Sequence, residues 1–361
     1  MKKTILLLVA IALTSAKMMA EGLTATLQQG ETMTAFYGVN AFVDAYNAAE
    51  DGAVITLSEG QFNDVSSIEK SITVVGNMAF DVEGYEKTYL GNSTNVTINA
   101  DNVNIEGICF YNYSLILGNI SNCHIRRCRF VYTLYNTYKT TNTNTLIDQC
   151  VLNNINLFAA SKNICIKNCT IYNLWGGDAE NVGYISNCYI NRFFARSWSS
   201  DDQLPYAIYK NNVLGIDYNS YSGYSCELKS PSEFYNNYFS YIGSYSSSMV
   251  SIYITTGCIN QGNVFSENVT YTSNNAPTNF ITDSFGMLGD DGTPIGITGG
   301  SGFSPYPSIP RITSKQIDSK TDSEGKLNVK ITVSTEETLV KEEKPEEEKP
   351  EEGTGEETTG E

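Results

Sequence analysis

The 361-residue sequence is poor in histidine, in positive charge and in long apolar runs. A single histidine, His124, excludes most histidine-based metal sites and argues against a Ser-His-Asp triad. The 23 Lys and Arg face 40 Asp and Glu, and this excess of acid excludes the basic surface that nucleic-acid binders need. Past residue 20 no apolar stretch is long enough to span a membrane. No CxxC pair occurs, so we predict no metal site.

The two ends of the chain differ from its middle. Residues 1–20 carry two leading lysines and an apolar run from Ile5 to Leu13, which is typical of a secretory signal peptide. We therefore expect export to the periplasm, the cell surface or the medium. Residues 341–361 hold ten Glu, three Lys and no apolar residue, and they are predicted to be disordered. This acidic tail is interpreted as a solubilising end or spacer, with cation or partner binding as the alternative.

The middle of the chain repeats a six-residue frame. Its sixth residue is apolar, its third is Asn, Gln or Gly, and its fourth is often Cys or Asn. Successive fourth positions are 15 to 27 residues apart, and 19 residues is close to a minimal coil of three strands. We place the copies of the frame at Ile105, Ile120, Ile147, Ile166, Ile185, Tyr209, Phe234 and Asn260.

The third position of the frame predicts a turn. Asn and Gly share a tolerance of the left-handed backbone region, so their alternation favours one such turn in every coil. Stacked Asn side chains could also hydrogen-bond from coil to coil. The predicted structural ladder consists of Asn122, Asn168, Asn187, Asn211 and Asn236.

This pattern resembles the right-handed parallel β-helices of the pectin-lyase-like superfamily. Residues 42–62 resemble the N-terminal cap of that family, with a short amphipathic helix that presents Phe42, Ala45 and Tyr46 on one face. Secreted β-helix proteins of gut-type Bacteroidetes are similar. The resemblance implies an all-β solenoid with an N-terminal capping helix and a C-terminal strand element.

The repeat and its flanks divide the chain into five parts. Residues 1–20 form the signal peptide, 21–37 a lead segment and 38–267 the parallel β-helix. Residues 268–340 contain a last coil and a capping strand, which the alternation of apolar residues in 326–334 indicates. Residues 341–361 form the tail. We expect a monomer.

Nine cysteines remain to be explained. In-register side chains point the same way, which is poor geometry for a disulfide. We therefore interpret the cysteines at the fourth frame position as a buried thiol ladder. The four assigned to it are Cys123, Cys150, Cys169 and Cys188.

Catalytic motifs are missing. The resemblance implies lyases that hold calcium with acidic residues and use Arg or Lys as base, or hydrolases with clustered Asp beside a Gly-His-Gly motif. The chain has neither set. The candidates that remain for catalysis are Arg196, Asp201 and Asp202, and no cofactor is expected, with Ca²⁺ needed only by a lyase.

A glycan-binding surface is the other candidate site. The segments from Asn156, Asn173 and Arg192 align as one strand of three coils, so Phe158, Trp175 and Phe194 would stack. Aromatic faces bind sugar rings, and neighbouring polar groups bind hydroxyls. An inward-facing aromatic stack is the alternative. The predicted glycan-binding residues are Trp175, Asp178 and Trp198.

Three arginines stand close together at residues 126, 127 and 129. We interpret this cluster as a solvated corner, with local carboxylate pairing as the other option.

These observations favour a secreted, non-catalytic protein that binds glycan or associates with the cell envelope. One alternative is a polysaccharide lyase or glycoside hydrolase acting on an acidic polysaccharide, and another is a structural surface adhesin. The expected partner is a polysaccharide or envelope glycan, with no nucleic acid and no membrane span.

Overall fold

A computed structural model of the chain describes fifteen segments of it. Its regular structure is almost all β-strand, with one short helix, α2 (Ala41–Ala48), which confirms the predicted all-β class. The chain forms two units, Met1–Pro307 and Ser308–Glu361. The described residues are 22–91, 95–111, 113–136, 140–157, 161–176, 183–193, 206–217, 226–228, 232–242, 252–254, 258–266, 288–289, 291–306, 311–317 and 329–334.

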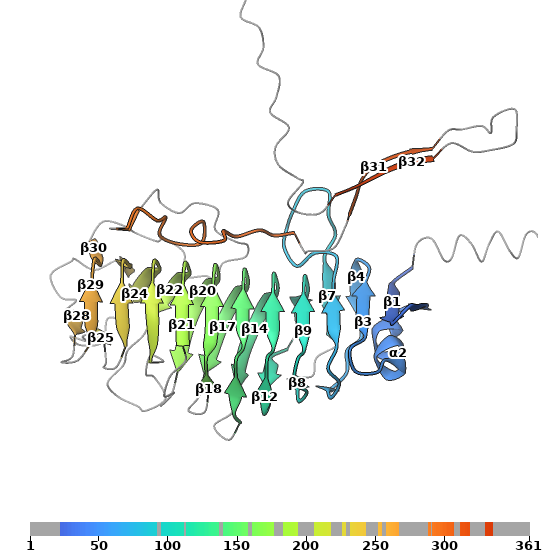
Figure 1. The fold of residues 1–361 in the computed structure, drawn as a ribbon, viewed down its shortest axis with the longest axis horizontal. Coiled ribbons are helices and arrows are strands. Elements are labelled where there is room, and N and C mark those ends of the chain that lie inside the picture. The colour runs from blue at the N-terminus through green and yellow to red at the C-terminus, as the bar shows by residue number, and fades with distance from the viewer. Residues whose placement is uncertain are drawn as a thin grey trace, which may run out of the picture. The chain divides into compact units, whose positions relative to one another are not determined.

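The first unit is a parallel β-solenoid, as the repeat predicted. Its strands stack in chain order from α2 to β30 (Figure 1). Sheet A has twelve strands, and all but the first two pair in parallel. The parallel strands are β3 (Val54–Leu57), β6 (Thr73–Val75), β9 (Asn104–Glu106), β13 (His124–Arg126), β16 (Leu146–Asp148), β19 (Ile164–Lys167), β21 (Gly183–Ser186), β23 (Ala207–Lys210), β26 (Glu233–Tyr235) and β29 (Ile259–Gln261).

Sheet B forms the second face of each coil. Its strands are β4 (Gly60–Phe62), β7 (Thr88–Leu90), β10 (Cys109–Phe110), β14 (Arg129–Asn136), β17 (Val151–Leu157), β20 (Thr170–Gly176), β22 (Tyr189–Phe193), β24 (Val213–Asp217), β27 (Tyr238–Ile242) and β30 (Val264–Ser266). Through β14 this sheet also includes β5 (Ser67–Ile68), β8 (Val96–Ile98) and β11 (Leu115–Leu117). Shorter pairings complete the coils in β12 (Ile120–Ser121), β15 (Asn142–Thr143), β18 (Ser161–Lys162), β25 (Cys226–Leu228) and β28 (Ile252–Ile254).

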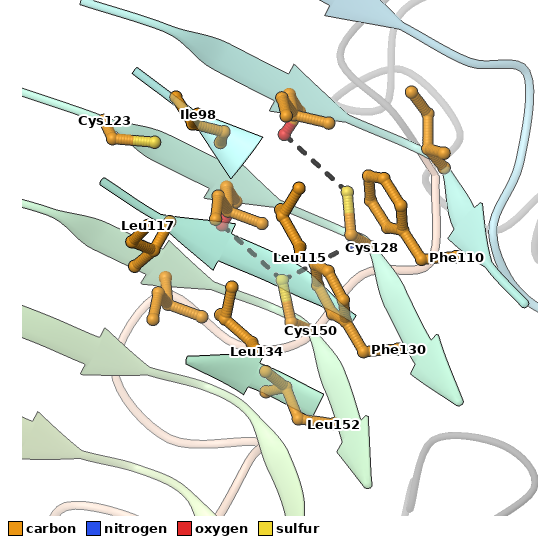
Figure 2. Close-up of a cluster of buried hydrophobic side chains, with 14 of the residues drawn as sticks. Ile98, Phe110, Leu115, Leu117, Cys123, Cys128, Phe130, Leu134, Cys150 and Leu152 are labelled. Atoms are coloured by element: carbon orange, nitrogen blue, oxygen red, sulfur yellow. Dashed lines mark hydrogen bonds between the residues drawn. The ribbon is translucent and has the colours of Figure 1, made fainter. Parts of the chain in front are cut away.

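The interior is filled by in-register rows of apolar side chains, part of which Figure 2 shows. Because strands pair without offset, like residues stack on like. The rings of Phe110 and Phe130 lie 4.7 Å apart and 7° from parallel, and those of Tyr209 and Phe234 lie 4.8 Å apart. Full burial of each such side chain contributes about 1.5–3 kcal/mol.

The fourth frame position forms a buried ladder of hydrogen bonds. The thiol of Cys150 donates to the Ile125 carbonyl at 3.5 Å and accepts the Cys128 amide at 3.5 Å. Asn212 fills the same position two coils beyond Cys169, donating to the Ile185 carbonyl at 2.8 Å and accepting the Cys188 amide at 2.9 Å. Cys and Asn can therefore replace one another at this position because both side chains donate and accept hydrogen bonds. The ladder runs through Cys128, Cys150, Cys169, Cys188, Asn212, Asn237 and Asn263.

One frame was placed wrongly in the sequence. Strand β13 aligns His124–Arg126 with Leu146–Asp148, so the frame of that coil begins at Ile125 and not at Ile120. Cys128 consequently belongs to the thiol ladder, and Cys123 does not. With this frame the uneven spacings of 15 and 27 residues become 20 and 22, which was the available signal.

Left-handed turns form two columns, where the sequence predicted one. The first column lies between the short strands and sheet A, and its side chains form the amide ladder: Asn144 donates to Asn122, and Asn122 donates to Asn102 at 3.1 Å. The second column lies between sheets A and B. It contains Arg127, Gln149, Asn168, Asn187, Asn211 and Asn236, all with φ between 49° and 57°.

Asn122 was therefore assigned to the wrong column, since the residue at its predicted position is Arg127, with φ of 49°. Asn168, Asn187, Asn211 and Asn236 do share the second column.

The N-terminal lead segment closes the first coil. Strands β1 (Thr24–Gln29) and β2 (Thr32–Tyr37) form an antiparallel hairpin, and β1 pairs antiparallel with β3. Helix α2 packs beside them and buries Ala41, Phe42, Ala45 and Tyr46. The hairpin thus covers the strand edge that the first coil would otherwise expose.

A segment after the last coil folds back along the solenoid. Residues 288–289 and 291–306, which we call the strap, cover the second turn column. Asn168 donates to the carbonyl oxygens of Ile297 at 3.0 Å and Gly299 at 2.6 Å, and Asn187 donates to that of Pro294 at 3.1 Å. The predicted coil-to-coil amide bonds therefore give way here to bonds with the strap.

Apolar contacts hold the same strap on sheet B. Ile295 and Ile297 pack on an outward row of that sheet, and the ring of Phe303 lies 5.4 Å from that of Phe80. For residues 268–340 the sequence predicted only a last coil and a capping strand. The row beneath the two isoleucines consists of Tyr189, Val213 and Tyr238.

The second unit contains a hairpin. Strand β32 (Val329–Ser334) lies within the predicted strand of residues 326–334 and pairs antiparallel with β31 (Arg311–Ile317), which the sequence did not indicate.

Candidate functional site

A groove crosses the outward face of sheet A over β21, β23, β26 and β29. It consists of two adjoining cavities of about 510 and 530 Å³ that share Ile208 and Glu233. Both volumes are typical of small-molecule sites. We define the groove by its lining residues Lys162, Asn163, Gly183, Tyr184, Tyr206, Ala207, Ile208, Lys210, Glu233, Tyr235, Asn236, Gln261 and Asp291.

The parallel register makes the groove amphipathic. One row of sheet A places Tyr184 beside Ile208, followed by Glu233 and Ile259. Tyr184 is 36% exposed and Ile259 is 44% exposed. The next outward row places Lys210 beside Tyr235 and Gln261. A ligand lying across these strands would meet aromatic and aliphatic surface on one side and hydrogen-bonding groups on the other.

One hydrogen bond and one ion pair link polar side chains of the second cavity. The Tyr235 hydroxyl donates to Glu233 Oε2 at 2.9 Å, which raises the pKa of Tyr235. Lys210 Nζ lies 3.3 Å from Asp291 Oδ2 of the strap. Hydrogen bonds from Thr293, and then Lys210, lower the pKa of Asp291. Asp291 is therefore ionised at neutral pH and unsuited to donate a proton, whereas glycosidases need one carboxyl with a raised pKa.

A raised carboxyl pKa occurs elsewhere. Burial raises the pKa of Asp64, which lies between β4 and β5 near Tyr113, several coils from the groove. The carboxyl with a raised pKa and the groove that could hold a substrate are thus on different parts of the solenoid.

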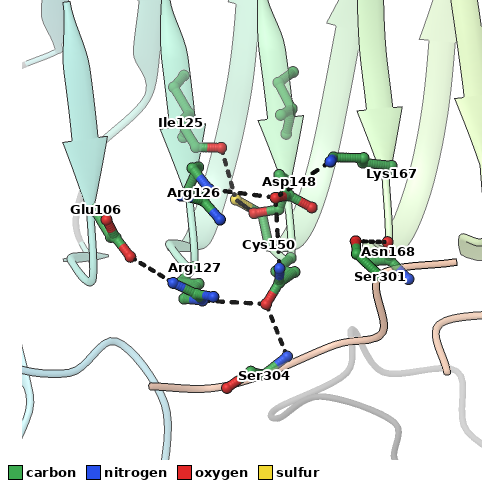
Figure 3. Close-up of polar contacts among 12 residues, drawn as sticks. Glu106, Ile125, Arg126, Arg127, Asp148, Cys150, Lys167, Asn168, Ser301 and Ser304 are labelled. Carbon is green, nitrogen blue, oxygen red and sulfur yellow. Dashed lines mark hydrogen bonds and ion pairs between the residues drawn. The ribbon is translucent and has the colours of Figure 1, made fainter. Parts of the chain in front are cut away.

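The three clustered arginines are paired with carboxylates, so the interpretation as a solvated corner is wrong. Figure 3 shows the pairs of Arg126 and Arg127. Arg127 is 5% exposed and lies 2.7 Å from Glu106 Oε1. Arg126 lies 3.3 Å from the buried Asp148, which also lies 3.8 Å from Lys167. Arg127 further donates to Gln149, which accepts the Ser304 amide of the strap at 2.8 Å, so this network ties the strap to two coils.

The predicted glycan surface is described only in part. Trp175 lies in β20, and its backbone pairs with Asn156 of β17. Asn156 thus takes the place in this row that the sequence alignment gave to Phe158, and that alignment is wrong by two residues. Leu174 pairs with Phe193 as predicted. Phe158, Asp178, Phe194 and Trp198 lie outside the described residues, as do the catalytic candidates Arg196, Asp201 and Asp202.

Sequence reasoning missed the groove on sheet A. Its strand residues flank the apolar frame positions Ile185, Tyr209 and Phe234 on either side, where the frame places no constraint. The signal that was available was the run of Tyr, Lys and Glu at these flanking positions.

Across the described segments, no helix is both long enough and apolar enough to cross a membrane. The same segments contain no cluster of three or more His, Cys, Asp or Glu side chains placed to hold a metal ion.

No protein-family model, curated protein or solved structure matches this chain. Its function is therefore inferred from the geometry of the solenoid.

Proposed function

We propose that the chain is a secreted, non-catalytic glycan-binding protein of the cell envelope or cell surface, and that its ligand lies in the groove of sheet A. The observation that carries the proposal is the pairing of a row that holds Tyr184 and two isoleucines with a row of hydrogen-bonding groups. Sugars have the same two-sided character, since their C–H faces stack on aromatic rings and their hydroxyls bind polar groups.

The solenoid supports extended ligands. Neighbouring strands are about 4.8 Å apart, so side chains in one row repeat at a spacing of the order of a sugar ring. The groove spans four strands of sheet A and would contact several sugar units of one chain.

Export and ancestry belong to the same proposal. Residues 1–20 have the features of a signal peptide, and residues 42–62 resemble the cap of pectin-lyase-like β-helices. The C-terminal strand segment, residues 326–334, resembles secreted β-helix proteins of Bacteroidetes type. The acidic tail would then serve as a spacer at the surface.

A glycan array probed with the exported chain, residues 21–361, tests the proposal. We expect binding to at least one class of polysaccharide, with no products formed. New reducing ends, or unsaturated products that absorb in the near ultraviolet, would show an enzyme and redirect attention to Arg196, Asp201 and Asp202. The absence of any glycan ligand would favour a structural adhesin.

The site itself needs a separate test. Trp175→Ala, with folding checked by circular dichroism, addresses the region that Trp175, Asp178 and Trp198 would form. Binding that is lost in this variant would place the ligand on sheet B.

A further inference from the structure

Glu233 differs from the other carboxylates that lie near basic residues. Within the described part of the chain, Asp148, Glu106, Asp81 and Asp291 each pair with Lys or Arg. Glu233 has no such ion pair there, and its Oε2 accepts the neutral hydroxyl of Tyr235. A half-buried carboxylate that has no cation of its own is suited to receive one from a ligand.

The position of Glu233 makes it central to the groove. It lines both cavities, so a ligand occupying either one approaches it. Tyr206 lines the first cavity, and Tyr184 and Tyr235 line the second. Aromatic faces attract cations, and a carboxylate flanked by such rings attracts them further.

The second cavity disfavours an anionic ligand, whereas the first is formally neutral because it is lined by Lys162 and Glu233. Lys210, the lysine of the second cavity, is already paired with Asp291. That cavity is lined by one Lys, one Asp and one Glu, which leaves it with one net negative charge. A uronate carboxylate placed there would meet like charge, which works against binding.

We infer that the groove selects glycans that carry a free amine, with the ammonium group bound by Glu233 beside Tyr235. This inference rests on the proposed function and specifies its ligand class. It opposes the sequence-based alternative of an acidic polysaccharide substrate.

The test compares three ligands of equal length by calorimetry at pH 5.5 and low salt: glucosamine oligosaccharides, their N-acetylated counterparts and oligogalacturonate. We expect the amine form to bind about tenfold more tightly than the N-acetylated form, and oligogalacturonate to bind weakest. Raising the salt concentration should reduce the preference for the amine.

The decisive variant is Glu233→Gln, which retains an acceptor for Tyr235 and removes the charge. It should bind the two glucosamine forms equally, while Glu50→Gln, on the exposed N-terminal cap, keeps the preference. Equal binding of both forms by the unmodified protein, or a preference that survives Glu233→Gln, would overturn the inference. Binding of none of the three ligands, together with a negative glycan array, would instead contradict the proposed function.

Discussion

The two outward faces of the solenoid carry similar apolar rows but are treated differently by the chain. On sheet B, the row of Tyr189, Val213 and Tyr238 is buried under Ile295 and Ile297 of the strap. On sheet A, the row of Tyr184, Ile208, Glu233 and Ile259 remains partly exposed. The protein thus supplies its own cover for one face and leaves the other open, which is why we propose that the ligand binds there.

The two turn columns show the same contrast. Asn102, Asn122, Asn144 and Asn163 are exposed and bond to one another, whereas Asn168 is 1% exposed and bonds to the strap. The backbone conformation is the same in both columns, so the difference arises from what lies above them.

Thiol labelling gives the largest expected difference between the faces. Burial raises the pKa of Cys109, in the outward row of sheet B, from 9.0 to about 11. Its thiolate should therefore be about a hundredfold scarcer at pH 8 than that of an unperturbed thiol. Cys165, in the open row of sheet A, is only half-buried. Burial also raises the pKa of Cys165, but its greater exposure should let iodoacetamide modify it before Cys109, as read by peptide mass spectrometry.

The pH dependence has a definite sign. Because the pKa of Cys109 is raised, its labelling rate should increase about tenfold per pH unit until the pH reaches about 11. Equal labelling of Cys109 and Cys165 at pH 8 would contradict the prediction that sheet B is covered and sheet A is open.

Shortening one apolar side chain of the strap tests its packing on sheet B. Ile297 is 1% exposed, so Ile297→Ala should lower the free energy of unfolding by about 2–5 kcal/mol. Ile208→Ala on the open face removes a half-buried side chain and should cost clearly less. Urea denaturation of the two variants measures the difference. A larger loss at Ile208 would mean that sheet A, and not sheet B, carries the tighter packing.

Glycine substitutions separate the two columns. Glycine tolerates the left-handed φ, so Asn168→Gly keeps the turn and removes the side-chain bonds to Ile297, Gly299 and Ser301. The buried carbonyls left unpaired should cost about 1–3 kcal/mol. Asn122→Gly removes exposed amide bonds and should cost a few tenths of a kcal/mol. Similar midpoints of thermal unfolding for the two variants would argue against a strap held by Asn168.

The sequence predicted the solenoid because its signal repeats in every coil. The apolar sixth position and the left-handed third position are constraints of the backbone and core, and both are present. The register failed at Asn122, since an Asn also stands at the other turn of that coil and Arg127 occupies the expected position. An arginine there is tolerated because Glu106 and Gln149 pair with it.

The strap was beyond sequence reasoning for a different reason. It depends on residues that are distant in the chain: Asn168 meets Gly299 across 131 positions. No periodicity marks such a contact. The glycines and prolines of the strap predict turns but do not indicate the surface on which those turns lie.

Co-sedimentation with a panel of insoluble neutral, amine-bearing and acidic polysaccharides tests most directly whether the open face binds glycan. Tyr184 lies on that face, and Tyr132, 51% exposed in β14, provides a matched tyrosine on sheet B. We predict that the unmodified protein and Tyr132→Ala sediment equally with at least one polysaccharide, and that Tyr184→Ala binds it about tenfold more weakly. Binding that is retained in Tyr184→Ala and lost in Tyr132→Ala would place the ligand on the other face and contradict the proposal.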